Sequence, residues 1–193
     1  MRLTVTKDNV DKHIKELQDD VKRSSLNFDI WWIYKERRVR NKYEHVFNHY
    51  GWFFDASLHA HFVAMIMALY KLYERRNDTF NIAGFIALLK RGKFFTPKTL
   101  ALLKQKQNTI LPLWNKVAIL RNNLLGHRSL KKKSSDVFKD AQIKPRDLRN
   151  LICMTKKLLN EASQAWDRRT LCDVTAKHDT IRLLDALKAN NSE

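Results

Sequence analysis

The sequence predicts an all-α protein that folds as a helical bundle. Its 193 residues include only four Gly and three Pro, whereas an all-β protein of this length needs many more turn residues. Apolar residues make up 44% of the chain and recur with the period of amphipathic helices. Five Trp and ten Phe supply bulk for a core. A chain of this length typically forms one domain, so we expect a single helical domain over residues 1–193.

Three helices are expected in the first part of the chain. The apolar residues between positions 7 and 23 fall on one face and predict an N-terminal helix within residues 1–26. The aromatic-rich segment that follows Asn27, Phe28 and Asp29 predicts a second helix, and Gly51 offers its stop. Asp55 fits as the N-cap of a third helix. Residues 62–72 of that helix are apolar on almost every side, which predicts a central buried helix.

Caps and proline positions outline the middle of the chain. Asp78 or Thr79 is expected to cap a helix that stops at Gly92. Thr96–Pro97 is a cap followed by proline at the first helical position, so it predicts the start of the next helix. Pro112 predicts a kink or a new start.

The last part of the chain predicts two more helices. A long amphipathic helix is expected from about residue 145 to residue 167, and a short terminal helix within residues 170–193. The chain shows no internal repeat and no long linker, so about seven helices should pack into one bundle.

The composition favours a cytoplasmic protein with reduced thiols. No apolar run approaches the ~18 residues of a membrane span, and the N-terminal segment lacks the apolar centre of a signal peptide. Cys153 and Cys172 are too few for a disulfide framework and have no CxxC spacing. Cys153 lies in an amphipathic segment and is expected to be a small core residue. We expect no membrane segment and no cofactor.

The net charge of +17 is the most informative property of the composition. From Thr79 to Ser135, 57 residues contain no Asp or Glu and carry +12 of that charge. A window of this kind indicates a polyanionic partner, with RNA or DNA as the leading candidate through phosphate neutralisation. A solvated basic face without a partner is the alternative. The basic residues of this acid-free window are Lys90, Arg91, Lys93, Lys98, Lys104, Lys106, Lys116, Arg121, Arg128, Lys131, Lys132 and Lys133.

The stretch "RNNLLGH" at residues 121–127 lies inside this window. Read locally, it is a helix end, with Gly126 as the C-terminal cap and with His127 and Arg128 near the last carbonyl groups. The alternative is an active site, because arginine and histidine are the residue types that hold a phosphate and move protons at neutral pH.

The same stretch resembles the signature of the HEPN superfamily, which is an Arg followed by a polar residue and, several residues later, a His. Arg121, Asn122 and His127 match it, with five residues between the Arg and the His. The segments "WWIYKERR" (31–38), "HYGWFFDASLHAHF" (49–62) and "ALYKLYERRNDTFNI" (68–82) resemble the abortive-infection, AbiU-type branch of that superfamily. The resemblance covers residues 28–165.

This resemblance implies a HEPN-like bundle of about four or five core helices with short accessory helices. It also implies a metal-independent endoribonuclease with Arg121, Asn122 and His127 as catalytic residues. The implied biological role is that of a toxin or an antiviral abortive-infection effector, with tRNA or mRNA as candidate substrates and a cognate antitoxin as a candidate partner. The family pattern further implies a homodimer with a composite active site.

The chemistry of these side chains fits RNA cleavage without a metal. Such cleavage needs a proton to leave the 2′-OH, a proton to reach the 5′-oxygen, and charge support at phosphorus. His127, with an ordinary pKa of about 6.5, can serve as base or acid. Arg121 can grip phosphate oxygens, and Asn122 can orient the histidine or a phosphate oxygen. Gly126 would let the chain leave helical geometry and turn His127 toward Arg121.

The basic residues after the motif are expected to hold the RNA backbone. They are Arg128, Lys131, Lys132 and Lys133. One histidine cannot both take and give a proton in a concerted step, which favours a dimer that brings two motifs together. The alternative function is a non-catalytic basic helical module that binds RNA or an acidic protein partner.

A histidine cluster is the main rival site. His45 and His49 share one helical face, and His59 and His61 follow shortly after, which is spacing that a metal site could use. Few carboxylates accompany them, HExxH is absent, and aromatic neighbours favour packed histidines. We therefore expect no metal site.

Overall fold

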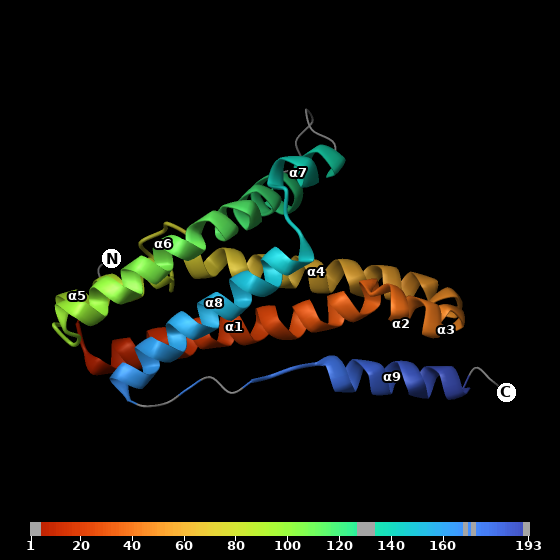
Figure 1. The fold of residues 1–193 in the computed structure, drawn as a ribbon, viewed down its shortest axis with the longest axis horizontal. Coiled ribbons are helices and arrows are strands. Elements are labelled where there is room, and N and C mark those ends of the chain that lie inside the picture. Colours follow the sequence, from red (N-terminus) through yellow and green to blue (C-terminus); the bar gives the residue numbers. More distant parts are fainter. Residues whose placement is uncertain (1–4, 127–133, 168–169, 171–172, 191–193) are drawn as a thin grey trace.

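The computed structural model describes residues 5–126, 134–167, 170 and 173–190 (Figure 1). Over these residues the chain forms α-helices and one π-helix and no strand, which confirms the all-α prediction. The elements are α1 (Lys7–Lys35), α2 (Arg37–Lys42), α3 (Glu44–His49), α4 (Gly51–Tyr73), α5 (Ile82–Arg91), α6 (Pro97–Leu120), η1 (Arg121–Gly126), α7 (Ser134–Ala141), α8 (Pro145–Trp166) and α9 (Lys177–Asn190).

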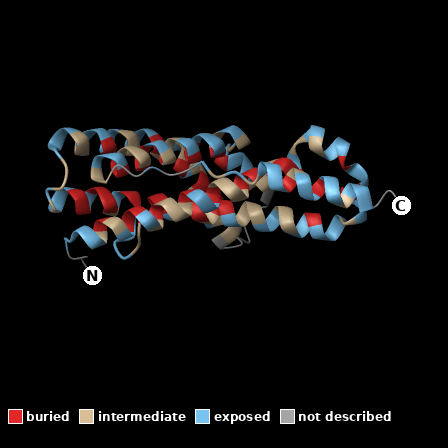
Figure 2. Ribbon diagram, turned by 90° about the horizontal axis from the view of Figure 1, so that it is seen from below, coloured by how far each residue is buried: buried red, intermediate tan, exposed pale blue. Residues whose placement is uncertain are grey.

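Four long helices form the body of the bundle. α1 and α4 lie side by side along the long axis, α8 packs on α1, and α6 contacts both α4 and α8 (Figure 1). α5 closes one end of the bundle, where it contacts α1, α4 and α6. α2, α3 and α9 cover the opposite end. Buried residues line the inner faces of these helices (Figure 2).

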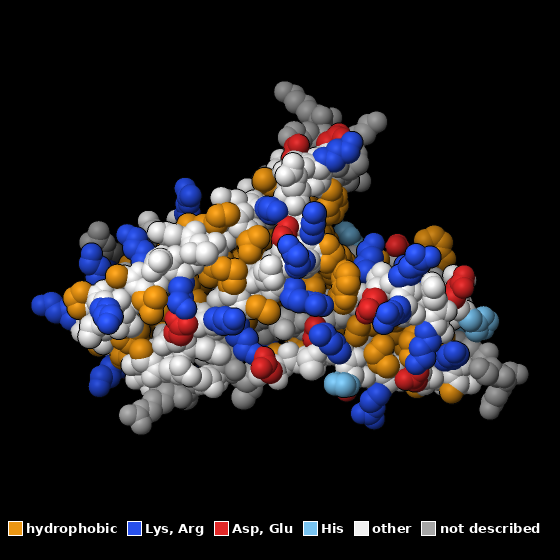
Figure 3. All heavy atoms as spheres, viewed as in Figure 1, with side chains coloured by type: hydrophobic (Ala, Val, Ile, Leu, Met, Phe, Trp, Pro, Cys, Tyr) orange, Lys and Arg blue, Asp and Glu red, His pale blue; other side chains and the backbone are white. Residues whose placement is uncertain are grey.

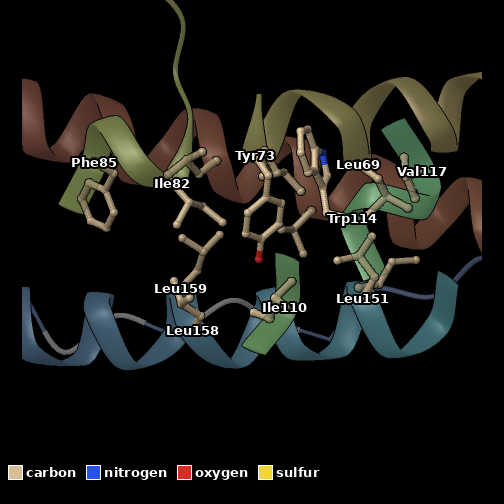
Figure 4. Close-up of a cluster of buried hydrophobic side chains, with 14 of the residues drawn as sticks. Leu69, Tyr73, Ile82, Phe85, Ile110, Trp114, Val117, Leu151, Leu158 and Leu159 are labelled. Carbon is tan, nitrogen blue, oxygen red and sulfur yellow. The ribbon is translucent and has the colours of Figure 1, made fainter. Parts of the chain in front are cut away.

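The main core lies where α4, α5, α6 and α8 converge (Figure 4). Leu69 of α4, Val117 of α6 and Leu151 of α8 are fully buried there. At its centre the hydroxyl of Tyr73 lies 2.8 Å from Oγ1 of Thr155, and that Oγ1 donates to the carbonyl of Leu151. The two buried hydroxyls at this point are therefore satisfied by each other and by a backbone carbonyl.

A second, smaller core holds α2, α3 and α9 to the bundle. Tyr34 of α1, Phe47 of α3 and Phe54 of α4 form its centre. The rings of Phe47 and Phe54 are edge-to-face at 4.7 Å, and those of Tyr34 and Phe54 at 5.2 Å. Leu184 of α9 is fully buried against this cluster.

The N-terminal helices differ from the prediction. α1 is continuous over 29 residues, because Asn27 does not cap a new helix but donates its amide to the carbonyl of Arg23. Asp29 also stays inside α1, where it accepts hydrogen bonds from Thr175 Oγ1 at 2.5 Å and from the amide of Ala176 at 3.3 Å, just ahead of α9. Gly51 begins α4 instead of ending the preceding helix.

The caps in the middle of the chain are partly as predicted. Thr96 caps α6 as expected, and Gly92 follows α5 as its stop. A Cβ at Gly92 would lie 2.1 Å from Cε2 of Phe94, so this position needs glycine for space. The cap of α5 is Asn81, whose side chain accepts from the amide of Gly84, and not Asp78 or Thr79.

Pro112 does not divide its helix. α6 runs through it from Pro97 to Leu120, so the two predicted segments are one helix. The burial of Trp114, Val117 and Leu120 on the following turns explains this, because their packing outweighs the hydrogen bond that proline cannot donate. The expectation of a single domain stays a prediction.

α4 carries apolar residues on its exposed faces as well as on the face that packs in the core. Among the described residues it is the one helix long and apolar enough to cross a membrane by length and composition, with a mean hydropathy of 1.3 and 28% of that window buried. This corrects the expectation that no segment reaches such a length. The prediction that residues 62–72 are buried all round is correct for one face only. Met65 and Leu69 on that face are fully buried, whereas Ala64 is exposed. That face packs into the bundle as a core helix does.

We predict that Tyr73→Phe lowers the free energy of unfolding by about 1 kcal/mol at pH 7, because the core loses one hydrogen bond to Thr155. Burial raises the pKa of the Tyr73 phenol above its ordinary value. The folded wild type therefore loses stability as the pH rises above about 10, where the unfolded phenol ionises. Urea denaturation of both proteins at pH 7 and about pH 10.5 should show the difference shrinking at the higher pH; an unchanged difference would contradict the assignment.

Candidate active site

The Arg121 motif begins where the chain leaves α-helical geometry. α6 ends at Leu120 and continues directly as the π-helix η1, Arg121–Gly126. The amide of Arg121 is shared between the carbonyls of Val117 and Ala118. The sequence predicted that Gly126 would release the helix, but the departure occurs five residues earlier, at Arg121 itself. Single π-helical turns are rare and are frequent at functional sites.

The guanidinium of Arg121 is held by an aromatic shelf. Its Cζ lies 4.7 Å from the ring centroid of Tyr70 in α4. The Tyr70 ring in turn stacks on Trp114 of α6 at 5.8 Å, and the indole of Trp114 donates to the Tyr70 carbonyl at 3.1 Å. This shelf, formed by Tyr70 and Trp114, fixes the plane of the arginine before any ligand binds.

Hydrogen bonds also orient the side chains within the motif. Nη1 of Arg121 donates to Oδ1 of Asn122 at 3.1 Å. Asn122 is exposed, whereas the next residue, Asn123, donates its amide to the carbonyl of Ile119 at 2.9 Å. Asn122 therefore sits at the surface beside the guanidinium, and Asn123 helps to hold the π-turn.

One donor of Arg121 is left without a partner. Its Nε is buried, and no hydrogen-bond acceptor contacts it among the residues that the structure describes. A buried donor without an acceptor costs about 1–3 kcal/mol, so such groups require an explanation. An oxygen of a bound phosphate is an acceptor of the right charge, and the arginine fork can bind one or two of its oxygens.

The structure describes two residues of the predicted site, Arg121 and Asn122, which are in contact. His127, Arg128, Lys131, Lys132 and Lys133 lie outside the described residues. Sequence reasoning missed Tyr70 and Trp114 as partners of Arg121. Tyr70 lies within a segment that resembled the family, but only the fold shows that it meets a residue 51 positions later.

Two basic residues of the acid-free window form ion pairs with acidic residues of α8. Lys106 pairs with Glu161 at 2.5 Å, and Lys116 pairs with Asp147 at 2.9 Å. Over the described ranges, five other cations of the window are exposed and make no ion pair, and Lys and Arg side chains are spread over the visible face of the molecule, the α5 end included (Figure 3). These are Lys90, Arg91, Lys93, Lys98 and Lys104.

The histidine cluster does not converge. The rings of His45 and His49 are 6.2 Å apart on α3 and both side chains are exposed. His61 instead lies 2.8 Å from Oδ1 of Asn27 through its Nδ1. Among the side chains that the structure describes, no three His, Cys, Asp or Glu residues could share a metal ion. The expectation for Cys153 was wrong, because this thiol is exposed on α8.

Comparisons with known proteins identify the family. The family model HEPN_AbiU2, described as AbiU2, matches residues 7–185. The match contains the whole of the expected range 28–165 and extends it to the start of α1 and into α9. No curated protein and no solved structure matches the chain. Since the family model covers most of the sequence and the described residues form an all-helical fold, this chain belongs to the AbiU2 family of HEPN-type abortive-infection proteins.

Proposed function

We propose that this chain is a metal-independent endoribonuclease of the HEPN type, which acts in the cytoplasm as a toxin or antiviral abortive-infection effector. The observation that carries the proposal is the state of Arg121. The guanidinium is oriented on the Tyr70 ring at the start of a π-turn and keeps a buried Nε donor without an acceptor among the described residues. A cation that is already oriented and still has a free donor can stabilise the negative charge that develops on a phosphate in the transition state.

The proposed reaction is attack of an RNA 2′-oxygen on the neighbouring phosphorus. His127 takes the proton of the 2′-OH, or gives one to the departing 5′-oxygen. Arg121 supports the charge on the non-bridging oxygens through its guanidinium. Asn122, already bonded to Nη1 of Arg121, orients either a phosphate oxygen or His127. Arg128, Lys131, Lys132 and Lys133 hold the flanking backbone of a tRNA or mRNA.

A homodimer would supply the second proton-transfer group. α4 carries a stripe of apolar residues at three- and four-residue spacing, which therefore lie on one helical face: Trp52, Ala56, Ala60, Val63, Met67 and Tyr70. Trp52 is 92% exposed, Ala56 and Ala60 are exposed, and the remaining three are only partly buried. We term this set the α4 stripe.

The α4 stripe leads directly to the candidate active site. Its last member, Tyr70, is the residue on which Arg121 rests. A second copy that covered the stripe with its own α4 in parallel would bring its Tyr70, and so its own motif, beside Arg121 of the first copy. Small residues such as Ala56 and Ala60 allow two helices to approach closely, and burying Trp52 would remove a large apolar surface from water. A cognate antitoxin could act by covering the same surface or the basic residues that follow the motif.

A second candidate function is a non-catalytic basic module that binds RNA. The observation in its favour is the group of five exposed window cations, from Lys90 to Lys104, that make no ion pair with a described residue and lie on α5, on the start of α6 and between them. Such a surface would bind the phosphate backbone without sequence specificity and with strong dependence on salt.

The two candidates are separated by one assay. The purified full chain is incubated with tRNA and total RNA in excess EDTA, beside Arg121→Ala and His127→Ala. The ribonuclease proposal predicts cleavage by the wild type and none by either variant. Cleavage that survives both substitutions, or that strictly requires an added metal, would contradict it. Salt-sensitive RNA binding with no cleavage by any form would favour the binding module.

A further inference from the structure

A pocket lies at the α5 end of the bundle, away from the Arg121 motif. Its volume is about 690 Å³, and its walls come from the first turns of α1, the α4–α5 connection and α5. It shares no residue with the shelf of Tyr70 and Trp114 or with η1. Pockets of some 300–1,000 Å³ are of the size that small-molecule ligands fill.

The charge of this pocket is positive. Arg75, Arg76 and Arg91 line it, and no Asp or Glu is among its lining residues. Arg76 is already engaged, since its guanidinium makes two hydrogen bonds to Asp78, at 2.9 and 2.6 Å. Arg75 and Arg91 are exposed and make no ion pair with the described residues. Two guanidinium groups are therefore available to one anionic ligand.

A buried histidine adds a second polar feature to the wall. His13 is only 2% exposed, yet it lines the pocket. Its Nδ1 lies 3.0 Å from the carbonyl of Asn9 and so acts as the donor, which leaves Nε2 without a hydrogen bond to any described residue. Burial lowers the pKa of His13, so the ring is neutral at pH 7 and Nε2 is an acceptor. A ligand with a hydroxyl or amino group can satisfy it.

The rest of the pocket wall is apolar and consists mainly of small side chains. Ala83, Gly84, Ala87 and Leu88 of α5 form it, and Asn77 and Thr79 add neutral polar groups beside it. Small side chains let a flat ring system approach the helix backbone closely. The pocket thus combines free guanidinium groups, an unmatched acceptor, and a smooth apolar surface within one cavity.

We propose that this pocket binds a free nucleoside diphosphate, with the phosphates on Arg75 and Arg91 and with the base or sugar against the Ala83–Leu88 wall and His13. A phosphate alone would leave the acceptor and the apolar wall unused, and an unphosphorylated nucleoside would leave both guanidinium groups unused. An RNA strand would need a continuous track, whereas this cavity is bounded by α5, beyond which a separate groove contains Lys90 and Lys93. The site goes beyond the proposed ribonuclease function and does not depend on it.

The test is calorimetric titration of the full chain with ADP, adenosine, inorganic phosphate and a short single-stranded RNA. We expect ADP to bind more tightly than adenosine or phosphate. Arg75→Gln and Arg91→Gln should each weaken ADP binding by about 10-fold or more, because each removes a charge-assisted contact. Lys90→Gln is the matched control, since it removes the same charge from the adjacent residue on the other side of α5, and it should change affinity by less than about twofold.

Three results would overturn the proposal. The first is no binding of ADP at millimolar concentration to wild type that circular dichroism shows to be folded. The second is an equal loss of ADP binding in Lys90→Gln, which would indicate only general attraction to a basic surface. The third is displacement of ADP by RNA together with weaker RNA binding in Arg75→Gln, which would assign the pocket to the RNA backbone. Arg121→Ala should bind ADP with the affinity of wild type. The titration therefore tests the pocket even if the protein does not cleave RNA.

Discussion

Replacing Arg121 with alanine should reduce the rate of RNA cleavage by about 10²–10³-fold, because it removes a preorganised cation from the reacting phosphate. Arg121→Lys should recover only a small part of that rate. Lysine keeps the charge but lacks the planar fork that rests on Tyr70 at 4.7 Å. Single-turnover rates measured with saturating protein would separate this loss from weaker RNA binding.

A matched control exists in the same chain. Arg149 on α8 also places its guanidinium over an aromatic ring, that of Phe28 at 5.3 Å, but it lies outside the motif. Arg149→Ala should therefore leave the cleavage rate within about twofold of wild type. Equal losses in Arg121→Ala and Arg149→Ala, with thermal unfolding unchanged, would show that Arg121 has no special role. Tyr70→Leu, which removes the aromatic ring under the guanidinium and keeps an apolar side chain in the α4 stripe, should lower the rate by up to about 10-fold.

Introducing a charge into the α4 stripe should separate the dimer and abolish cleavage. Ala60→Glu places a carboxylate at the centre of the stripe, where each copy would face the other copy's carboxylate in a symmetric interface. Because Ala60 is exposed in the single chain, the fold should survive the change. Light scattering after size exclusion should report a dimer for wild type and a monomer for Ala60→Glu, with cleavage reduced by more than about 100-fold.

The control for this variant is Ala186→Glu, which makes the same change at an exposed position of α9. It should remain dimeric and active. A wild type that is monomeric at assay concentrations and still cleaves RNA would contradict the composite site, as would an Ala60→Glu variant that is monomeric and fully active.

Local patterns predicted the fold class and several helix ends, and the errors have a common cause. Thr96–Pro97 and Gly92 act where local capping rules place them. Asn27 and Asp29 look like the start of a new helix, but Asn27 bonds His61 of α4 and Asp29 bonds Thr175 and Ala176 just ahead of α9, and α1 continues through both. Pro112 remains within α6 for the same reason, because burial on the following turn outweighs a local preference. Local signals therefore fail where distant segments pack.

The candidate site was predictable as a motif but not as a geometry. The adjacency of Arg121 and Asn122 is read directly from the sequence. The π-turn is a change of backbone hydrogen bonding that no residue in "RNNLLG" requires by itself. The Tyr70 shelf depends on how α4 meets the end of α6, which is a long-range contact. The nucleotide pocket likewise gathers Arg75, Arg91 and His13 from three separate parts of the chain.

The central claim is that RNA is cut by its own 2′-oxygen under the control of Arg121 and His127, without a metal. The most direct measurement is the chemistry of the product ends after cleavage in excess EDTA. Attack by the 2′-oxygen should leave a 2′,3′-cyclic phosphate and a 5′-hydroxyl, and an oligonucleotide with a 2′-deoxy sugar at the cleavage position should remain uncut. Products with a 5′-phosphate, or cleavage of the 2′-deoxy substrate, would contradict the account.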